Sequence, residues 1–473
     1  MNTAKRRGPA PRSTATLLIA AVLLTAAIGC APHRGTWMPD RDPAASIRQA
    51  KLQAWRTGPR LLRVGLASGE DSVAVTLTAP AELHWLPAGR SPAGHGMRAE
   101  PGVWRLTPAD DTGTVTAWSP DGRGWRVELP EHGLLVRPAD PDGACEVDGT
   151  PYAGDLLATV RDGRLTLVNV VELETYLRGV VPWEIGRPGE AGLAALEAQA
   201  VAARTYTVSH LGARHDEGCD VWADTRDQVY RGLHGTDPWC DRAIANTAGL
   251  VLRHRGREIE AYYSSTCGGT TSAIEAVWPR PAQDYLRTHD DRGRDGRAYC
   301  ADSSQFTWEE TWSAAALTRI LAASLPAYRA WVEASPLRQA WAGEFFRPAR
   351  AGADPDAPGA LLDLRILDRT PSGRVRTLLV RTEAGEYRVR GDRTRWVLAP
   401  DGGRFGILRS AWFDVELRRD REGRPAEVAA AGRGFGHGIG LCQTGALGMA
   451  RLGADSARIL AHYYPGASLE TAW

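Results

Sequence analysis

Short runs of alternating apolar and polar residues fill the chain between residues 61 and 166, and Pro-Asp-Gly and Asp-Gly turns separate them. Alternation places the apolar side chains on one face of an extended segment, so it predicts a series of short β-strands. The expected strands contain the sequences RVGLA, VAVTL, AELHW, GVWRLTP, GTVTAW, GWRVEL and HGLLVR. A short helix at 46–56 is expected to precede this β-rich part.

A helical pattern follows in the centre of the chain. Residues 193–211 contain no glycine or proline, and small or apolar residues recur at helical spacing along one narrow face. This face predicts a helix that packs closely against its neighbours. The preceding segment, 179–192, holds two prolines and four glycines and cannot continue one helix. The pattern therefore places Glu184 on a constrained turn that leads into a rigid helix.

The second half of the chain changes pattern several times. Residues 249–265 predict a β-hairpin, residues 302–360 a Trp-rich helical region, and residues 361–419 further strands. A glycine-rich loop at 432–453 runs into a helix, and a last helix is expected near 455–463. This order predicts an α+β fold with a β-rich amino-terminal half, a central helix carrying the wall of the site, and a glycine-rich loop and helix at the carboxyl end.

The first thirty residues have the charge order of an export signal. Lys and Arg residues precede an apolar run from Thr16 to Ile28, which is too short for a comfortable membrane span. The run ends at Cys30 after Ala-Ile-Gly, which resembles the lipobox of bacterial lipoproteins, whose cysteine is acylated. We expect a lipoprotein signal peptide at 1–29 and a tether at 30–60; an ordinary signal peptide or an uncleaved anchor is the alternative. Each places the rest of the chain outside the cytoplasm.

Charge and cysteine content narrow the classes of partner. The 57 Lys and Arg residues balance 56 Asp and Glu residues, so no overall field attracts nucleic acid. Six cysteines follow Cys30, and an even number in an exported chain suggests disulfides, which sequence alone does not pair. Neither CxxC nor HxxxH spacing occurs, so the usual signature of a structural zinc site is missing.

The chain contains seventeen tryptophans, whose rings can stack on sugars or fill an ordinary hydrophobic core.

Four stretches are too specific for a generic scaffold. They are ELETYLRGVVPWEIG (172–186) with ALEAQAVAARTY (195–206), QVYRG (228–232), YYSSTCGGTTS (262–272) and GRGFGHGIGLCQTGALGMA (432–450). Together they resemble the sporulation stage II protein D family (SpoIID) and its amidase-enhancer relatives. The resemblance implies one SpoIID-like domain over 61–473, divided into a β-rich part 61–170, a catalytic core 171–300, a Trp-rich helical insert 301–360 and a closing part 361–473.

Members of that family are lytic transglycosylases or modulators of cell-wall amidases, and Glu184 matches their catalytic glutamate. A lytic transglycosylase lets the 6-hydroxyl of the sugar attack, so one carboxyl serves first as acid and then as base. The apolar neighbours in GVVPWEI would raise its pKa by desolvation. Without the resemblance, a capping glutamate or one that forms a salt bridge near Arg187 would be the favoured explanation of Glu184.

The same blocks supply further candidate residues. Those expected to contact substrate are Gln199, Arg204, Tyr230, Ser264, Ser265, Thr266, His437 and Gln443. Five of them have a structural alternative: Arg204 pairs with Glu197, the Ser264-Ser265-Thr266 segment is a plain tight turn, and His437 is a packed histidine that donates to a backbone carbonyl.

Two expectations concern the cysteines and metals. Some family members bind zinc just before the Gln-Val-Tyr block, but here His210, His215 and Cys219 are followed by Asp227 instead of a cysteine. A complete ligand set is not assembled there, so we expect no metal and no cofactor. A Cys267–Cys300 disulfide would pin the loop that carries Ser264, with a loop-closure stabilisation of about 3 kcal/mol.

The leading hypothesis is a lytic transglycosylase that cleaves peptidoglycan glycan strands in the cell envelope, held on the periplasmic or outer-membrane face by a lipid at Cys30. A non-catalytic enhancer that binds glycan or a cell-wall amidase is the alternative. A structural envelope lipoprotein whose Trp-rich insert 302–360 docks a partner is a third, more distant hypothesis.

Lipidation of Cys30 is directly testable in cells. An alkyne fatty acid should label the wild-type protein, and Cys30→Ser should abolish the label because the acceptor sulfur is lost. Cys145→Ser, which removes a cysteine far from the signal segment, should keep the label, as read by click chemistry and gel fluorescence. An unlabelled wild-type protein would contradict the lipoprotein assignment.

Overall fold

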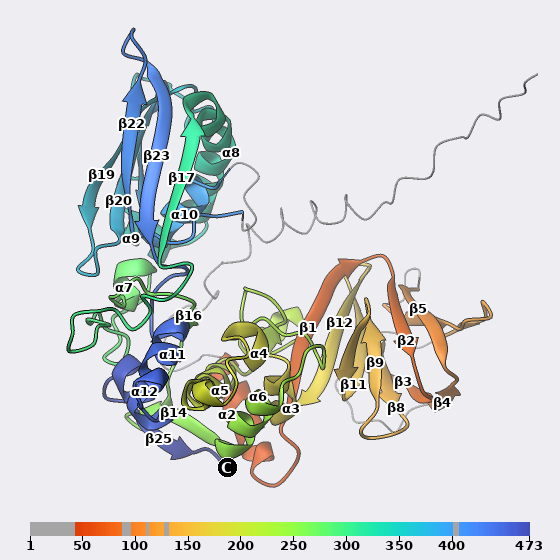
Figure 1. The fold of residues 1–473 in the computed structure, drawn as a ribbon. Coiled ribbons are helices and arrows are strands. Elements are labelled where there is room, and N and C mark those ends of the chain that lie inside the picture. The colour runs from red at the N-terminus through yellow and green to blue at the C-terminus, as the bar shows by residue number, and fades with distance from the viewer. Residues whose placement is uncertain (1–42, 88–95, 110–112, 127–131, 401–405) are drawn as a thin grey trace, which may run out of the picture.

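The computed structural model describes residues 43–87, 96–109, 113–126, 132–400 and 406–473, and the fold is α+β as the sequence predicts. Figure 1 shows three bodies: a β-sandwich, a helical centre and a second β-rich module. Cys30 and the export signal lie outside the described residues. Within the described ranges, no helix combines the length and apolar character needed to cross a bilayer.

The β-sandwich consists of two sheets whose apolar faces share one core. The first sheet has the order β13-β1-β12-β11-β8-β3-β4 and the second the order β10-β9-β2-β5-β6-β7. In β2 the side chains alternate between buried and exposed, which is the pattern that predicted these strands. The expected strand in GWRVEL is described only as far as residue 126, where it forms β7.

The bounds of the sandwich strands follow the expected segments. The first sheet contains β1 (Leu61–Glu70), β3 (Ala81–Pro87), β4 (Gly96–Ala99), β8 (His132–Pro138), β11 (Asp155–Arg161), β12 (Arg164–Glu172) and β13 (Val221–Trp222). The second contains β2 (Val73–Leu77), β5 (Gly102–Pro108), β6 (Val115–Trp118), β7 (Gly124–Trp125), β9 (Ala144–Val147) and β10 (Thr150–Ala153). The long antiparallel pair β1 and β12 leads from the sandwich into the helical centre (Figure 1).

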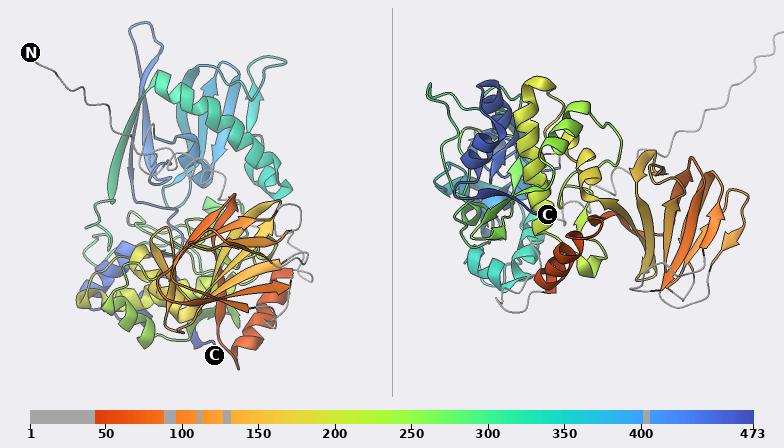
Figure 2. Two further views of the ribbon diagram at one scale, coloured as in Figure 1. Left: turned by 90° about the vertical axis from the view of Figure 1, so that its right-hand side faces the viewer. Right: turned by 90° about the horizontal axis from the view of Figure 1, so that it is seen from below.

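The helical centre is built around α5 (Leu193–Ser209), which is buried on nearly every side. The elements that contact it include α3 (Leu173–Arg178), α6 (Pro238–Asn246), α11 (Gln443–Arg451), α12 (Ser456–Tyr463) and β14 (Leu250–His254). The same body contains α2 (Pro43–Trp55) and β25 (Ser468–Thr471), which pairs with β14 (Figure 1). The sequence predicted one narrow packing face. The whole helix is covered instead, because its many alanines let neighbours from both halves of the chain approach closely. Figure 2 shows this centre beside the sandwich.

The expected hairpin over residues 249–265 is only partly present. β14 pairs with β15 (Arg257–Glu258) and, on its other edge, with β25 from the end of the chain. The next residues leave this sheet and form β16 (Tyr263–Ser264), which pairs in parallel with β24 (Leu441–Cys442). The backbone groups of β16 are therefore satisfied by the glycine-rich tail, and this pairing brings two of the sequence blocks together.

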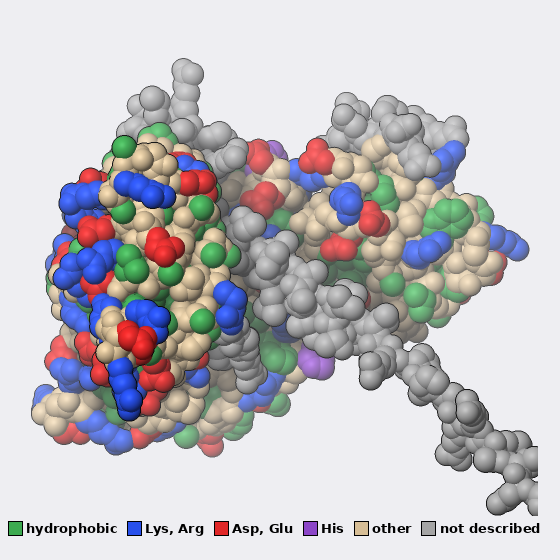
Figure 3. Space-filling model, turned by 90° about the horizontal axis from the view of Figure 1, so that it is seen from above, with side chains coloured by type: hydrophobic (Ala, Val, Ile, Leu, Met, Phe, Trp, Pro, Cys, Tyr) green, Lys and Arg blue, Asp and Glu red, His purple; other side chains and the backbone are tan. Residues whose placement is uncertain are grey.

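The second module has its own core, which runs from Trp308 to Ala430. Its strands are β17 (Thr307–Ser313), β18 (Phe346–Pro348), β19 (Leu361–Arg369), β20 (Val375–Thr382), β21 (Gly385–Arg390), β22 (Phe413–Arg419) and β23 (Pro425–Arg433), and its helices are α8 (Ala314–Glu333), α9 (Pro336–Ala342) and α10 (Thr394–Val397). One core thus joins the expected insert 301–360 to strands that the sequence analysis assigned to the closing part. Charged side chains of both signs are interspersed on its face in Figure 3.

A buried ion pair fixes α5 to its surroundings. The Arg204 side chain is fully buried, and its Nε and Nη2 donate to the Glu174 carboxylate at 2.9 and 2.6 Å. Its remaining donors reach the carbonyl oxygens of Leu250 at 3.2 Å and Ile244 at 3.4 Å. The planar guanidinium therefore ties α3, α6 and β14 to one point on the helix.

Removing Arg204 should destabilise the fold strongly, because Glu174 would keep its charge without its partner. Arg204→Met is expected to lower the free energy of unfolding by about 3 kcal/mol, the lower end of the range for a buried pair, because the Glu174 side chain is 24% exposed. The control is Arg178→Met, which breaks a pair with Asp241 whose side chains are 41% and 35% exposed and should cost about 0–1 kcal/mol. Urea denaturation measures both; equal losses would contradict a structural role specific to Arg204.

Candidate active site

Glu184 ends a one-turn helix, α4 (Val181–Glu184), that follows α3 directly. Pro182 stands in the first turn, where its missing N–H removes no helical hydrogen bond, and Gly186 takes a positive φ of 84° just after the turn. The backbone N–H of Glu184 donates to the Val180 carbonyl at 3.0 Å. The prolines and glycines that forbid a longer helix thus hold this residue on a short, closed turn.

Two donors hold the Glu184 carboxylate. Oε1 accepts from the backbone N–H of Val229 at 2.8 Å, and Oε2 accepts from Nε2 of Gln443 at 3.3 Å. Burial in an apolar surrounding raises the pKa of Glu184 to about 7, although both hydrogen bonds act in the opposite direction. A carboxyl with this pKa can both release and take up a proton near neutral pH.

Glu184 lies in a cavity of about 610 Å³ where the helical centre meets the second module. The centre contributes residues such as Tyr206, Asp227 and Tyr263, and the module contributes Trp331 and Trp396 among others. The cavity walls therefore come from segments that are more than two hundred residues apart in the sequence.

The cavity contains two further carboxyls that the sequence reasoning did not select, Asp227 and Asp392. Asp227 accepts from Nε of Arg214 at 3.1 Å and from the Tyr206 hydroxyl at 3.0 Å. Burial raises the pKa of Asp227, and Arg214 offsets part of this effect. Asp392 pairs with Arg395 at 3.2 Å. Among the described residues that line the cavity, Glu184 is the carboxyl with no recorded ion pair.

Gln228 supports the Glu184 turn from behind. Its side-chain oxygen accepts from the hydroxyls of Tyr176 at 3.1 Å and Thr207 at 2.7 Å, and its Nε2 donates to the Tyr263 hydroxyl at 2.8 Å. This buried network fixes the backbone next to Val229, which donates to Glu184. Gln228 was missed as a site residue, although its place at the start of the specific block 228–232 was an available signal.

Four of the eight residues expected to contact substrate line the cavity: Ser264, Ser265, His437 and Gln443. The Nδ1 atom of His437 accepts from the backbone N–H of Ile439 at 3.0 Å, and its ring lies 4.9 Å from that of Trp278. Burial lowers the pKa of His437 to about 4, so its imidazole is neutral at physiological pH.

The other four expected contact residues do not line the cavity, which corrects the sequence expectation. Gln199 and Arg204 are fully buried in α5, and Arg204 is occupied by Glu174, not by the expected Glu197. Tyr230 packs its ring on Tyr176 and donates to Asn169 at 2.8 Å. Thr266 is fully buried and bonds the hydroxyls of Ser303 and Thr444. Arg204, Tyr230 and Thr266 shape the core because their polar groups are satisfied inside the protein. The buried side-chain amide of Gln199 has no hydrogen-bond partner among the described residues.

Four tryptophans give the cavity an aromatic wall: Trp278, Trp331, Trp341 and Trp396. The guanidinium of Arg393 lies 4.0 Å from the ring of Trp331 and 5.0 Å from that of Trp396. Composition indicated an excess of tryptophan, but only the fold brings these four to one surface.

Cys267 and Cys300 do not belong to the region of His210, His215 and Cys219, where the sequence predicts no metal site. Cys267 and Cys300 are free thiols with Sγ atoms 3.7 Å apart, so the structure brings together the pair expected to form a disulfide. His210, His215 and Cys219 do not belong to the group of described side chains that could hold a metal ion. That group is formed by Cys267, Asp291, Cys300 and Cys442.

Two family models match the chain. Residues 161–254 match the model described as Stage II sporulation protein (SpoIID), and residues 272–440 match one described as Domain of unknown function (DUF8618). The first match contains Glu184, and the second covers most of the second module. The resemblance inferred from the sequence blocks is confirmed by the first of these matches and by the relatives that carry the same names.

Three curated relatives illustrate the likeness. The Amidase enhancer of Bacillus subtilis (strain 168) is 28% identical over 306 residues, which are 62% of this chain and 40% of that protein. Stage II sporulation protein D of Bacillus amyloliquefaciens is 28% identical over 320 residues, covering 64% and 76% of the two chains. Its namesake in Bacillus subtilis (strain 168) is 26% identical over 364 residues, covering 74% and 88%. The matched region therefore spans less than half of the amidase enhancer.

Glu184 should give the free energy of unfolding a distinct pH dependence. Its pKa is about 7 in the folded chain against an ordinary value of 4.5, so the folded state binds the proton more tightly. The resulting stabilisation is complete below the ordinary pKa and is lost as pH rises through 7, by at most about 3 kcal/mol. Between about pH 4.5 and pH 8, wild type should therefore lose more stability than Glu184→Gln, which cannot titrate.

Urea denaturation at both pH values measures this difference. The matched control is Glu190→Gln, an exposed residue of the same segment, which should follow the wild type. An identical pH dependence in wild type and Glu184→Gln would contradict the raised pKa.

Proposed function

We propose that this protein is a lytic transglycosylase of the cell envelope that cleaves the MurNAc–GlcNAc bond of peptidoglycan and leaves 1,6-anhydro-MurNAc ends. The names of its relatives support a role connected with the cell wall. The observation that carries the proposal is the Glu184 carboxyl, which is half-buried at the cavity, forms no ion pair within the part of the chain that the structure describes, and has a pKa of about 7.

One carboxyl is sufficient for this reaction. The protonated Glu184 donates its proton to the glycosidic oxygen as the bond to the leaving sugar breaks. The resulting carboxylate then accepts the proton of the 6-hydroxyl as that oxygen attacks the anomeric carbon. The amide donors of Val229 and Gln443 orient both oxygens and stabilise the ionised state between the two proton transfers.

The other carboxyls of the cavity argue against ordinary hydrolysis. A hydrolase that inverts or retains configuration uses a second carboxylate as base or nucleophile. Asp227 is held by Arg214, the Tyr206 hydroxyl and the Trp222 amide, and Asp392 is held by Arg395. Both are committed to ion pairs, so neither is free to activate water or to attack the sugar.

The remaining cavity surface suits a glycan strand. The rings of Trp278, Trp331 and Trp396 offer flat apolar faces on which sugar rings stack. Ser264, Ser265 and the neutral His437 supply polar groups near Glu184 for hydroxyl or acetamido groups. We infer that glycan enters between the helical centre and the second module, outside the cytoplasm, where an anchor at Cys30 would hold the protein near its substrate.

A second candidate function follows from one relative's name. The Amidase enhancer is 28% identical to this chain, so the same cavity could bind glycan for a partner amidase without performing chemistry. The two functions differ in whether Glu184 transfers protons.

Glu184→Gln tests the choice because the amide keeps the shape of the side chain and loses the proton. Turnover of denuded glycan strands should fall about 10²–10⁴-fold, the usual share of general acid–base catalysis, while glycan binding in a pull-down stays intact. Glu190→Gln again serves as control and should keep wild-type turnover. Mass spectrometry of the wild-type products should find 1,6-anhydro ends.

Two outcomes would contradict the proposal. Products with reducing ends would mean hydrolysis. Wild type and Glu184→Gln that are equally inert on glycan, yet equally able to stimulate a cell-wall amidase, would establish the enhancer function instead.

A further inference from the structure

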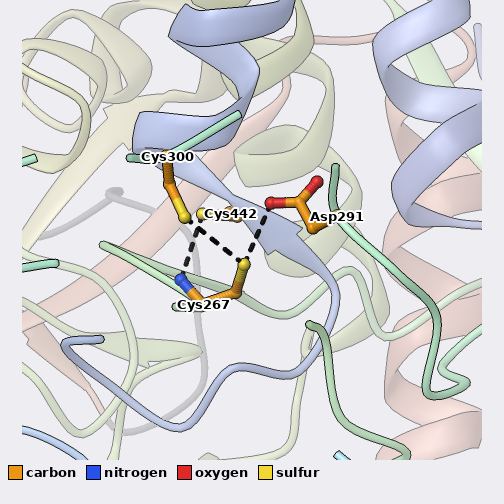
Figure 4. A group of neighbouring side chains, drawn as sticks. All are labelled: Cys267, Asp291, Cys300 and Cys442. Atoms are coloured by element: carbon orange, nitrogen blue, oxygen red, sulfur yellow. Dashed lines mark hydrogen bonds between the residues drawn. The ribbon is translucent and has the colours of Figure 1, made fainter. Parts of the chain in front are cut away.

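Three cysteines and an aspartate meet in the core next to the active site (Figure 4). Cys267, Asp291 and Cys442 are 0% exposed and Cys300 is 1% exposed. One donor atom from each lies within 4.8 Å of all the others. The residues come from separate segments: Cys267 follows β16, Asp291 and Cys300 lie in the loop before the second module, and Cys442 ends β24.

The four donor atoms are close enough to share one metal ion, and the distance between two of the sulfurs matches the edge of a zinc tetrahedron. Zinc binds thiolate sulfur at about 2.3 Å, which places two sulfurs of a tetrahedron about 3.8 Å apart. The Sγ atoms of Cys267 and Cys300 are 3.7 Å apart, and Cys267 Sγ is 2.9 Å from Asp291 Oδ2. The backbone N–H of Cys267 also donates to Cys442 Sγ at 3.1 Å, so the third sulfur belongs to the same cluster.

Charge favours a cation over a disulfide in this cluster. A Cys267–Cys300 bridge would use two sulfurs and leave the Cys442 thiol and the Asp291 carboxylate buried beside it. A buried carboxylate is costly unless a cation or several donors compensate it. Among the described residues, Asp291 accepts from the Cys267 thiol at 2.9 Å, and its ion pair is with Nε2 of His462 at 2.9 Å, which is charged only when the imidazole is protonated. A disulfide would remove the thiol donor. A divalent cation would satisfy all four donors at once.

We propose that Cys267, Asp291, Cys300 and Cys442 bind a structural zinc ion. Three thiolates and one carboxylate complete a four-coordinate shell of protein ligands, which is typical of structural and not of catalytic zinc sites. His462 donates to the second oxygen of Asp291 and orients it, as residues around a metal commonly orient its ligands. This site replaces the disulfide expected for Cys267 and Cys300 and lies away from His210, His215 and Cys219.

The position of the ion would couple it to the active site and to the second module. Cys442 is the residue before Gln443, whose amide contacts Glu184, and its sulfur accepts from the Gly445 N–H at the start of α11. The carbonyl of Cys267 accepts from Arg374 of the second module at 2.7 Å. The ion would therefore fix where Gln443 points and where the module attaches. The inference rests on the cluster alone and holds whether or not Glu184 is catalytic.

Metal analysis of the full mature chain, purified with added Zn²⁺ and dialysed, tests the proposal. Inductively coupled plasma mass spectrometry should find about one zinc per chain in wild type and almost none in Cys300→Ser. Cys145→Ser and Cys219→Ser, which remove buried cysteines outside the cluster, are the matched controls and should keep the ion.

A second measurement needs no cluster variant and remains valid if Cys300→Ser fails to fold. Wild type loaded with Co²⁺ should develop sulfur-to-metal charge-transfer absorption and the intense visible bands of a tetrahedral site, and Zn²⁺ should abolish them. Folded wild type that binds neither metal would overturn the proposal. A Cys267–Cys300 disulfide in non-reducing peptide maps of the protein isolated from cells would overturn it too.

Discussion

The burial of one helix on nearly every side is the constraint on which the rest of the structure depends. A helix without a solvent face needs neighbours all around it. α5 obtains them from α3 and α6, which lie near it in the sequence, and from α11 and α12 at the carboxyl end of the chain. Small side chains permit the close approach, and Arg204 is acceptable there only because Glu174 and two carbonyls satisfy it. The carboxyl-terminal segment must therefore pack against the helical centre. This packing places Gln443, the first residue of α11, next to Glu184.

The local sequence pattern predicted most of the helices and strands. It failed where packing between segments distant in the sequence determines the structure. Strands of the sandwich, the long helix and the two last helices lie close to their expected positions, because alternation and helical spacing report local burial. The hairpin over 249–265 is shorter than expected, since Tyr263 and Ser264 find a parallel partner near the end of the chain. The strands of 361–419 and the Trp-rich helices form a single core, and no local sequence pattern predicts this association.

For the site, motif position identified the proton-transferring candidate, and chemical type alone misassigned several neighbours. Gln199, Arg204, Tyr230 and Thr266 carry groups that suit sugars, yet each faces the interior. The converse error concerns Gln228 and Asp227, whose roles depend on contacts with Tyr176, Tyr263 and Arg214 that only the fold creates. A polar residue in a specific block is equally able to hold the backbone of a site and to touch its ligand.

The second module leaves and rejoins the centre at neighbouring points. β17 and β23 run side by side from Thr307 paired with Arg433, and the Gly434 N–H donates to the Phe306 carbonyl at 2.9 Å (Figure 1). The two points at which the chain leaves and re-enters the helical centre are therefore neighbours. A domain inserted between such points can be gained or lost without a change in the topology of the rest of the fold. The second module can therefore be exchanged as a unit during evolution, which would change the tryptophans that it contributes to the cavity while Glu184, Val229 and Gln443 keep their geometry.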